Sequence, residues 1–166
     1  MITDAQLYEL AERVGHALHA KGWTLATAES CTGGWVAQAV TAVPGSSAWF
    51  ERGFVTYTNI AKQEMLGVQR ATLDAHGAVS EPAAREMGLG ALAHSHARVA
   101  IAITGIAGPS DGHPNATVGT VCFGWGERCG DVQTITRHFD GEREAVRRQA
   151  VGVALELVMA LAAGAP

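Results

Sequence analysis

The chain has 166 residues, of which 48% are hydrophobic and 17% charged, and this composition excludes the disordered class. The formal net charge is −4 and there is no lysine- and arginine-rich cluster, so we expect no nucleic acid partner. No apolar stretch is long enough to cross a membrane, and three cysteines without a CxxC pair indicate reduced thiols in a cytoplasmic protein.

The first half of the chain alternates helices with short apolar strands. Thr3 or Asp4 caps the first helix, and Thr58 or Asn59 caps the third. The predicted elements are helices at 4–19, 31–41 and 58–68 and strands at 23–28 and 50–57.

The second half begins with the clearest helix start, where Ser80 is followed by Glu81 and Pro82. The elements predicted after it are a helix over 81–97, an apolar strand at 99–104, a β-hairpin from 117–125 and 131–139, and a long helix over 140–164. The order predicts a single domain spanning 1–166. Its expected fold is a three-layer α/β/α sandwich with a mixed, mostly parallel sheet containing the C-terminal β-hairpin.

Three polar or glycine-rich segments come directly after apolar strands. They are "ESCTGG" at 29–34, "YTNIAK" at 57–62 and "TGIAGP" at 104–109. In open α/β sheets, ligands bind outside the carboxyl ends of parallel strands. The sequence therefore predicts one site built from all three segments. The histidines are scattered and no HExxH motif is present, so we expect no metal there.

Two candidate nucleophiles stand side by side in the first segment. Ser30 either caps the following helix or, if Thr32 is the cap, faces a cleft. In that cleft, helix-terminal N–H groups and the glycines Gly33 and Gly34 approach an oxyanion closely. Cys31 either packs as a small buried residue or acts as a thiolate whose pKa is lowered by the helix N-terminus.

A serine nucleophile needs a base, and the second segment offers two candidates. Lys62 serves if burial lowers its pKa, and the Tyr57 hydroxyl can relay the proton. Both residues also fit ordinary roles, Lys62 as a solvated surface lysine and Tyr57 as a packed ring with an exposed hydroxyl.

The third segment and the last helix offer groups for an anion. Thr104 and Gly105 either supply a hydroxyl and an N–H or simply form a tight turn, and "TGIAGP" is not a dinucleotide or Walker fingerprint. Arg143 and Arg147, four residues apart on one helix face, either clamp a phosphate or are solvated.

Four stretches of the chain resemble the CinA C-terminal domain family. They are "TAESCTGG", "VPGSSAWFERGFVTYTNIAKQEMLGV", "HGAVSEPAAREM" and "AITGIAGP" with the later "VGTV". The resemblance covers essentially the whole chain. It implies a metal-free amidohydrolase without a cofactor that converts nicotinamide mononucleotide to nicotinate mononucleotide and ammonia in pyridine nucleotide recycling. The second domain often fused N-terminally in CinA proteins is absent here, so we expect the standalone form.

The resemblance also implies roles for individual residues. Ser30 takes the place of the nucleophile, and Tyr57 and Lys62 match the stretch that activates it. The expected substrate-binding residues are Cys31, Thr32, Gly33, Gly34, Asn59, Thr104, Gly105, Arg143 and Arg147.

Two other functions and one partner stay open at this point. One alternative to the implied enzyme is a non-catalytic nucleotide-binding or regulatory domain. The other is an amidase that acts on another small carboxamide. A family of this size commonly forms homodimers, and Trp35, Trp49 and Phe50 fit either a dimer contact or core packing.

Overall fold

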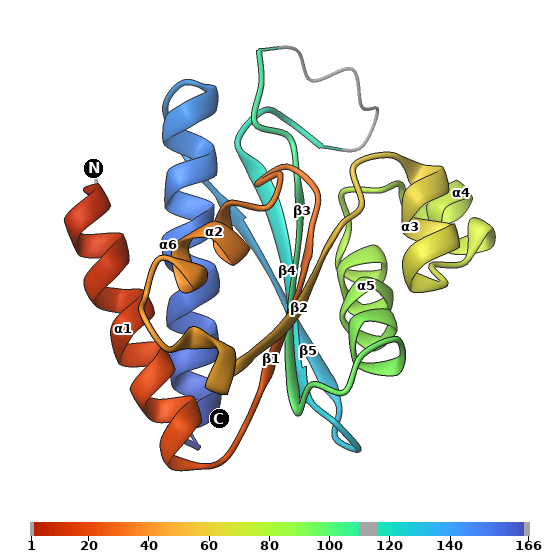
Figure 1. Ribbon diagram of the computed structural model, residues 1–166. Helices are drawn as coiled ribbons and strands as arrows, with labels where there is room; N and C mark the ends of the chain where they lie inside the picture. Colours follow the sequence, from red (N-terminus) through yellow and green to blue (C-terminus); the bar gives the residue numbers. More distant parts are fainter. Residues whose placement is uncertain (1, 110–115, 165–166) are drawn as a thin grey trace.

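A five-stranded sheet lies between two layers of helices in the computed structural model, which describes residues 2–109 and 116–164 (Figure 1). The helices are α1 (Asp4–Ala20), α2 (Trp35–Thr41), α3 (Asn59–Leu66), α4 (Arg70–His76), α5 (Glu81–Ala93) and α6 (Arg143–Ala162), with the 3-10 turn η1 (Ser46–Ala48). The strands are β1 (Leu25–Glu29), β2 (Phe50–Val55), β3 (Val99–Gly105), β4 (Thr120–Glu127) and β5 (Val132–His138). None of these described helices combines the length and the apolar character that a bilayer crossing requires.

The strand order is β2-β1-β3-β4-β5. Strand β1 pairs in parallel with both β2 and β3, whereas β4 runs antiparallel to β3 and to β5. Helices α1, α2 and α6 cover one face of the sheet, and α3, α4 and α5 lie on the other (Figure 1). The predicted α/β/α sandwich with a mixed sheet and a C-terminal hairpin is therefore confirmed. The carboxyl ends of β1, β2 and β3 meet at one edge of the sheet.

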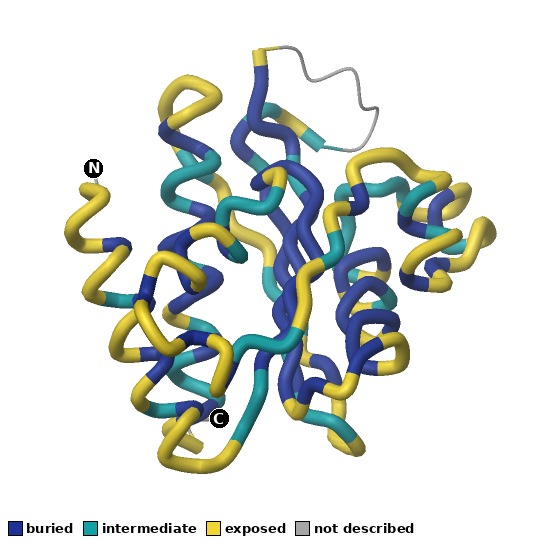
Figure 2. The backbone as a smooth tube through the Cα atoms, viewed as in Figure 1, coloured by how far each residue is buried: buried dark blue, intermediate teal, exposed yellow. Residues whose placement is uncertain are grey.

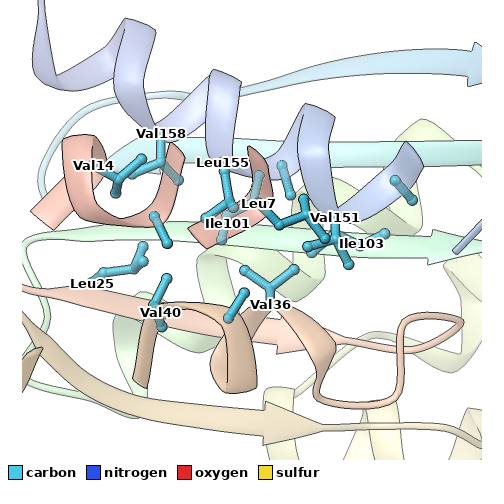
Figure 3. Close-up of a cluster of buried hydrophobic side chains, with 14 of the residues drawn as sticks. Leu7, Val14, Leu25, Val36, Val40, Ile101, Ile103, Val151, Leu155 and Val158 are labelled. Atoms are coloured by element: carbon cyan, nitrogen blue, oxygen red, sulfur yellow. The ribbon is translucent and has the colours of Figure 1, made fainter. Parts of the chain in front are cut away.

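The two faces of the sheet differ in side-chain size. Large residues of β3 such as Ile101 and Ile103 pack against α1, α2 and α6, where Figure 3 shows them among leucines and valines. The alternate positions, Ala100 and Ala102, belong to a second core cluster on the α5 side. The buried strands run between outer helix surfaces that are largely exposed (Figure 2). Period-two alternation along β3 thus assigns a bulky face and a flat face.

Helix α5 packs very closely on the flat face because glycines line its contacts. A Cβ atom added to Gly90 would lie 2.0 Å from the carbonyl oxygen of Leu66 at the end of α3. A Cβ on Gly124 of β4 would lie 2.4 Å from the carbonyl oxygen of Ala84 in α5. Backbone therefore meets backbone at both contacts, and no side chain fits between them.

The helix predicted over 31–41 begins four residues later than expected, at Trp35. Gly33 and Gly34 have φ angles of +62° and +93°, so the chain turns through left-handed conformations before the helix starts. Helix α4 was not predicted because no side chain caps its N-terminus at Gln69. The Gln69 N–H instead donates to the carboxylate of Glu86 in α5, at 2.8 Å.

The aromatic residues proposed for either the core or a dimer contact are inside or against the core. Trp49 is buried, and Trp35 and Phe50 pack partly buried against the same cluster. Core packing is therefore the alternative that accounts for these three side chains.

Gly90→Ala is expected to lower the free energy of unfolding by about 3 kcal/mol, because its methyl group would force α5 away from α3. The matched control is Gly152→Ala in the middle of α6, where the nearest atom is the flexible side-chain end of Ile2, at 3.2 Å. We expect this control to change stability by less than about 1 kcal/mol, since alanine also favours the helix. Urea denaturation of both variants measures the difference, and equal midpoints would contradict the close contact.

Candidate active site

A cavity of about 290 Å³ lies where the three predicted segments meet at the ends of β1, β2 and β3. The predicted site residues that line it are Ser30, Cys31, Tyr57, Asn59, Lys62, Thr104, Gly105 and Arg143. The lining residues that the sequence analysis did not select are Ala78, Val79, Ile106, Ala107 and Gly108. Ile106 to Gly108 lie within the "TGIAGP" segment. Ala78 and Val79 lie within the family stretch "HGAVSEPAAREM" but carry no polar side chain that marks them as site residues.

Ser30 and Lys62 form a buried pair at the base of this cavity. The Lys62 Nζ atom lies 3.0 Å from the Ser30 Oγ atom and 3.0 Å from the carbonyl oxygen of Thr56. Lys62 is 1% exposed and Ser30 7% exposed. Thr58 places the lysine, because its hydroxyl caps α3 by accepting a hydrogen bond from the N–H of Ala61. The structure therefore brings together a candidate nucleophile and base that are 32 residues apart.

Burial lowers the pKa of Lys62 from its ordinary value of 10.5 to about 8. Its hydrogen-bond partners are a hydroxyl and a carbonyl, and within the described residues no carboxylate forms an ion pair with it. At pH 7, roughly one Lys62 side chain in ten is then neutral and able to accept a proton. The solvated-surface alternative for Lys62 does not describe this position.

Cys31 adopts the role of a small packed residue. Its side chain is 6% exposed, and burial raises the pKa of the thiol to about 12, with the nearby Glu29 carboxylate acting in the same direction. Of the two alternatives for Cys31, the packed residue therefore describes this position, and a thiol pKa lowered by a helix N-terminus does not. The reason is that α2 begins four residues after Cys31 and its N-terminus is already occupied by a carboxylate.

That carboxylate belongs to Glu29, the last residue of β1. Its side chain is fully buried, its Oε1 accepts from the N–H of Val36 at 2.8 Å, and its Oε2 accepts from the N–H of Ala37 at 3.0 Å. Gly34, rather than Ser30 or Thr32, occupies the capping position of α2. The side chains of Ser30 and Thr32 therefore do not cap α2. The N–H groups of its first turn, which were expected at an oxyanion, are instead bound to Glu29.

Tyr57 lies at the exposed side of the cavity, with 57% of its surface accessible. Its hydroxyl accepts a hydrogen bond from Arg143 Nη2 at 2.9 Å, and Arg143 Nη1 donates to the carbonyl oxygen of Gly108 at 2.7 Å. Tyr57 is thus joined to the last helix instead of to Ser30 or Lys62. Within the described residues its hydroxyl makes no hydrogen bond to Ser30 or Lys62, and a catalytic part for Tyr57 stays a prediction.

Thr104 and Gly105 shape the cavity wall through packing. The Thr104 hydroxyl donates to the carbonyl oxygen of Ala78 at 2.8 Å, so its proton is engaged inside the protein. A Cβ on Gly105 would lie 2.8 Å from Val121 Cγ2 and 3.1 Å from the Cys31 sulfur. Gly105 is therefore required by a close approach between β3, β4 and the first segment.

Four predicted substrate-binding residues line a separate hollow beside the cavity. They are Thr32, Gly33, Gly34 and Arg147. Arg147 donates from Nε to the carbonyl oxygen of Cys31 at 3.0 Å and from Nη2 to that of Thr32 at 3.1 Å. The Arg147 guanidinium is thus bonded to the backbone of the first segment, and its contact with a phosphate stays a prediction. Across residues 2–109 and 116–164, no three His, Cys, Asp or Glu side chains are grouped closely enough to hold a metal ion.

A family model described as the CinA C-terminal domain matches residues 7–162 of the chain. The nicotinamide-nucleotide amidohydrolase PncC of Escherichia coli K12 is 54% identical over 155 residues, covering 93% of this chain and 94% of that protein. The protein of the same name from Enterobacter agglomerans is 50% identical over 158 residues, covering 95% and 96%. A crystal structure of a CinA superfamily protein from Klebsiella pneumoniae superposes with a TM-score of 0.92 at 43% identity, covering 95% of this chain and 98% of that one.

Lys62→Met is expected to stabilise the protein by about 1 kcal/mol at pH 7. Keeping a charged lysine where its pKa is about 8 costs about 3 kcal/mol, and the loss of two hydrogen bonds offsets part of the gain. Because the folded pKa lies below the unfolded one, the wild-type protein should gain stability between pH 8 and about 10.5, and the variant should not. Thermal denaturation across this range tests both effects. Lys21→Met, at the chain's other lysine, is the surface control; a loss above about 2 kcal/mol in Lys62→Met alone would contradict the assignment.

Proposed function

The chain belongs to the CinA C-terminal domain family, and on this premise we propose that it is a nicotinamide-nucleotide amidohydrolase. The reaction is hydrolysis of nicotinamide mononucleotide to nicotinate mononucleotide and ammonia. The observation that carries the proposal is the buried contact of 3.0 Å between Ser30 Oγ and Lys62 Nζ inside a cavity. The relatives named for this activity match the chain over more than nine-tenths of its length.

The first step is attack of Ser30 on the carboxamide carbon of the substrate. In its neutral form, Lys62 accepts the serine proton along the contact that already joins the two side chains. A bond forms between Ser30 Oγ and the carboxamide carbon, and the carbonyl oxygen becomes an oxyanion. The lowered pKa of Lys62 makes this transfer feasible near neutral pH.

Backbone N–H groups next to Ser30 are the candidates to stabilise the oxyanion. Among the hydrogen bonds of the described residues, none uses the N–H of Cys31 or of Thr32 as donor. Donors held in place by the protein stabilise the developing charge, and losing one typically costs about 3 kcal/mol. The N–H groups of Cys31 and Thr32 are therefore the oxyanion donors of the proposed mechanism.

The tetrahedral intermediate then collapses: its carbon–nitrogen bond breaks, the carbonyl re-forms, and the Lys62 ammonium gives its proton to the leaving nitrogen, which departs as ammonia and leaves a serine ester. Water then attacks the serine ester, with Lys62 again accepting a proton, and the carboxylate product and free Ser30 result. Nucleophile and base are both side chains, so the scheme is metal-free and uses no cofactor. In this scheme Tyr57, whose hydroxyl is bonded to Arg143 at the exposed side of the cavity, binds the substrate.

The charge of the cavity suits an anionic nucleotide. Its described lining contains the cations Lys62 and Arg143 and no carboxylate. A guanidinium group binds phosphate with two parallel hydrogen bonds, and Arg143 lies on the exposed side of the cavity beside Tyr57. We assign the substrate phosphate to Arg143. A cytoplasmic location, in which the cysteines stay reduced, completes the proposal, and a homodimer stays a prediction.

Ser30→Ala is expected to reduce kcat for ammonia release from nicotinamide mononucleotide by about a thousandfold or more, because the nucleophile is lost. Cys31→Ala should keep kcat within about tenfold, since a buried, protonated thiol takes no part in the chemistry. Treatment with a chelator should leave both results unchanged. Loss of activity in Cys31→Ala together with an active Ser30→Ala would make the thiol the nucleophile.

As the pH increases toward 8, kcat/KM is expected to rise about tenfold per pH unit. Above pH 8 it should level off. The value rises with pH because Lys62 must be neutral to accept the serine proton. The rise ends near pH 8 because the pKa of Lys62 is about 8. Initial rates of ammonia release between pH 6 and pH 9.5 measure the profile. A profile that is flat over this range would remove Lys62 from the role of base.

A further inference from the structure

Ser30 and the two candidate oxyanion donors lie on one short segment, Ser30–Gly34, here named the nucleophile loop. The loop leaves β1 at Glu29 and enters α2 at Trp35. Within it, the N–H of Gly33 donates to the carbonyl oxygen of Ser30 at 3.0 Å. Its geometry decides where the serine oxygen and the N–H groups lie relative to a bound carboxamide.

The inner side of the nucleophile loop is fixed by Glu29. Each of its carboxylate oxygens accepts one N–H from the first turn of α2, those of Val36 and Ala37. The residue that ends β1 is thereby bonded to the helix that follows the loop. Both ends of the loop are held at a set separation by a carboxylate that solvent does not reach.

The outer side of the nucleophile loop is fixed by Arg147 of α6. Its guanidinium donates to the carbonyl oxygens of Cys31 and Thr32 and lies 5.4 Å from the centre of the Trp35 ring. The carbonyl of Cys31 and the N–H of Thr32 belong to the same planar trans peptide unit, so they point in opposite directions. A guanidinium that holds this carbonyl therefore also sets the direction of the Thr32 N–H.

We propose that Arg147 is a positioning residue that orients the Thr32 N–H for the oxyanion, rather than a ligand of the substrate phosphate. The proposal rests on the proposed function, because it concerns the transition state of that reaction. Arg147 lies outside the lining of the Ser30 cavity, whereas Arg143 is part of it. The planar fork of arginine suits two neighbouring carbonyls, and a lysine cannot bridge them in the same way.

Helix α6 supplies matched comparisons for the test. Arg143, Arg147 and Arg148 lie within two turns, and they have different partners. Arg143 contacts Tyr57 and Gly108 at the cavity. Arg148 is ion-paired with Asp4 and Glu144 and lies 5.0 Å from the centre of the Trp35 ring, but within the described residues it makes no hydrogen bond to the nucleophile loop. All three arginines line one surface hollow, and Arg147 and Arg148 both lie over the Trp35 ring, so the comparison separates the hydrogen bonds to the nucleophile loop from the charge and the ring contact.

The kinetic experiment compares Arg147→Gln, Arg143→Gln and Arg148→Gln on nicotinamide mononucleotide and on the unphosphorylated nicotinamide riboside. Arg147→Gln should lower kcat by about a hundredfold on both substrates, with KM within about threefold, because one transition-state donor is misdirected. Arg143→Gln should raise KM for the nucleotide only. Arg148→Gln should match the wild-type protein. Arg147→Lys should lose nearly as much kcat as Arg147→Gln, because charge without the fork does not restore the geometry.

A second readout on the free protein does not depend on turnover. Hydrogen exchange of the backbone amides should accelerate at residues 31–34 in Arg147→Gln and Arg147→Lys but not in Arg148→Gln. An increase in KM confined to the phosphorylated substrate in Arg147→Gln would overturn the proposal, as would unchanged kcat with unchanged exchange. Absence of ammonia release by the wild-type protein would instead refute the proposed function, and exchange at the loop would still report on Arg147.

Discussion

A lysine amine held inside the protein is the constraint on which the candidate site depends. Burial disfavours the charged form of Lys62, and its two hydrogen-bond partners, Ser30 and Thr56, are neutral groups. These partners fix the position of the amine without restoring its ordinary pKa. Lysine usually lies at the surface, but at this buried position its lowered pKa makes it a base. The arrangement requires that the ends of β1 and β2, which are followed by Ser30 and Thr56, lie beside α3, which carries Lys62. The parallel pairing of β1 with β2 and the Thr58 cap of α3 hold these elements in place.

Most of the fold was predictable because local signals and burial agree. Thr3, Thr58 and Ser80 cap the helices that they were expected to cap, and the apolar runs are the buried strands. Helix α4 escaped prediction for a physical reason: the carboxylate of Glu86, which comes from another helix, takes the place of a local cap. The late start of α2 was missed because consecutive left-handed glycines can either end a turn or begin a helix, and periodicity does not distinguish these cases.

The sequence indicated which residues line the candidate site, but not which hydrogen bonds they make. Strand-end reasoning selected Ser30 and Lys62 together, since parallel strands bring their carboxyl ends to one edge. The partners of Tyr57 and Arg147 depend on the path of the nucleophile loop and on the rotation of α6, which are tertiary features. Glu29 was visible in the sequence as a charge that ends an apolar run, but nothing local indicated that its carboxylate would bind the first turn of the next helix.

The hydrogen bond from Thr104 to the carbonyl oxygen of Ala78 joins two parts of the cavity wall. It attaches the segment before α5 to the end of β3, and α5 in turn contacts the sheet so closely that an added Cβ atom at Gly124 would meet its backbone. We therefore expect this wall to keep its place when a ligand binds. We expect adjustment to the shape of a larger ligand where the lining residues Tyr57 and Asn59 are exposed.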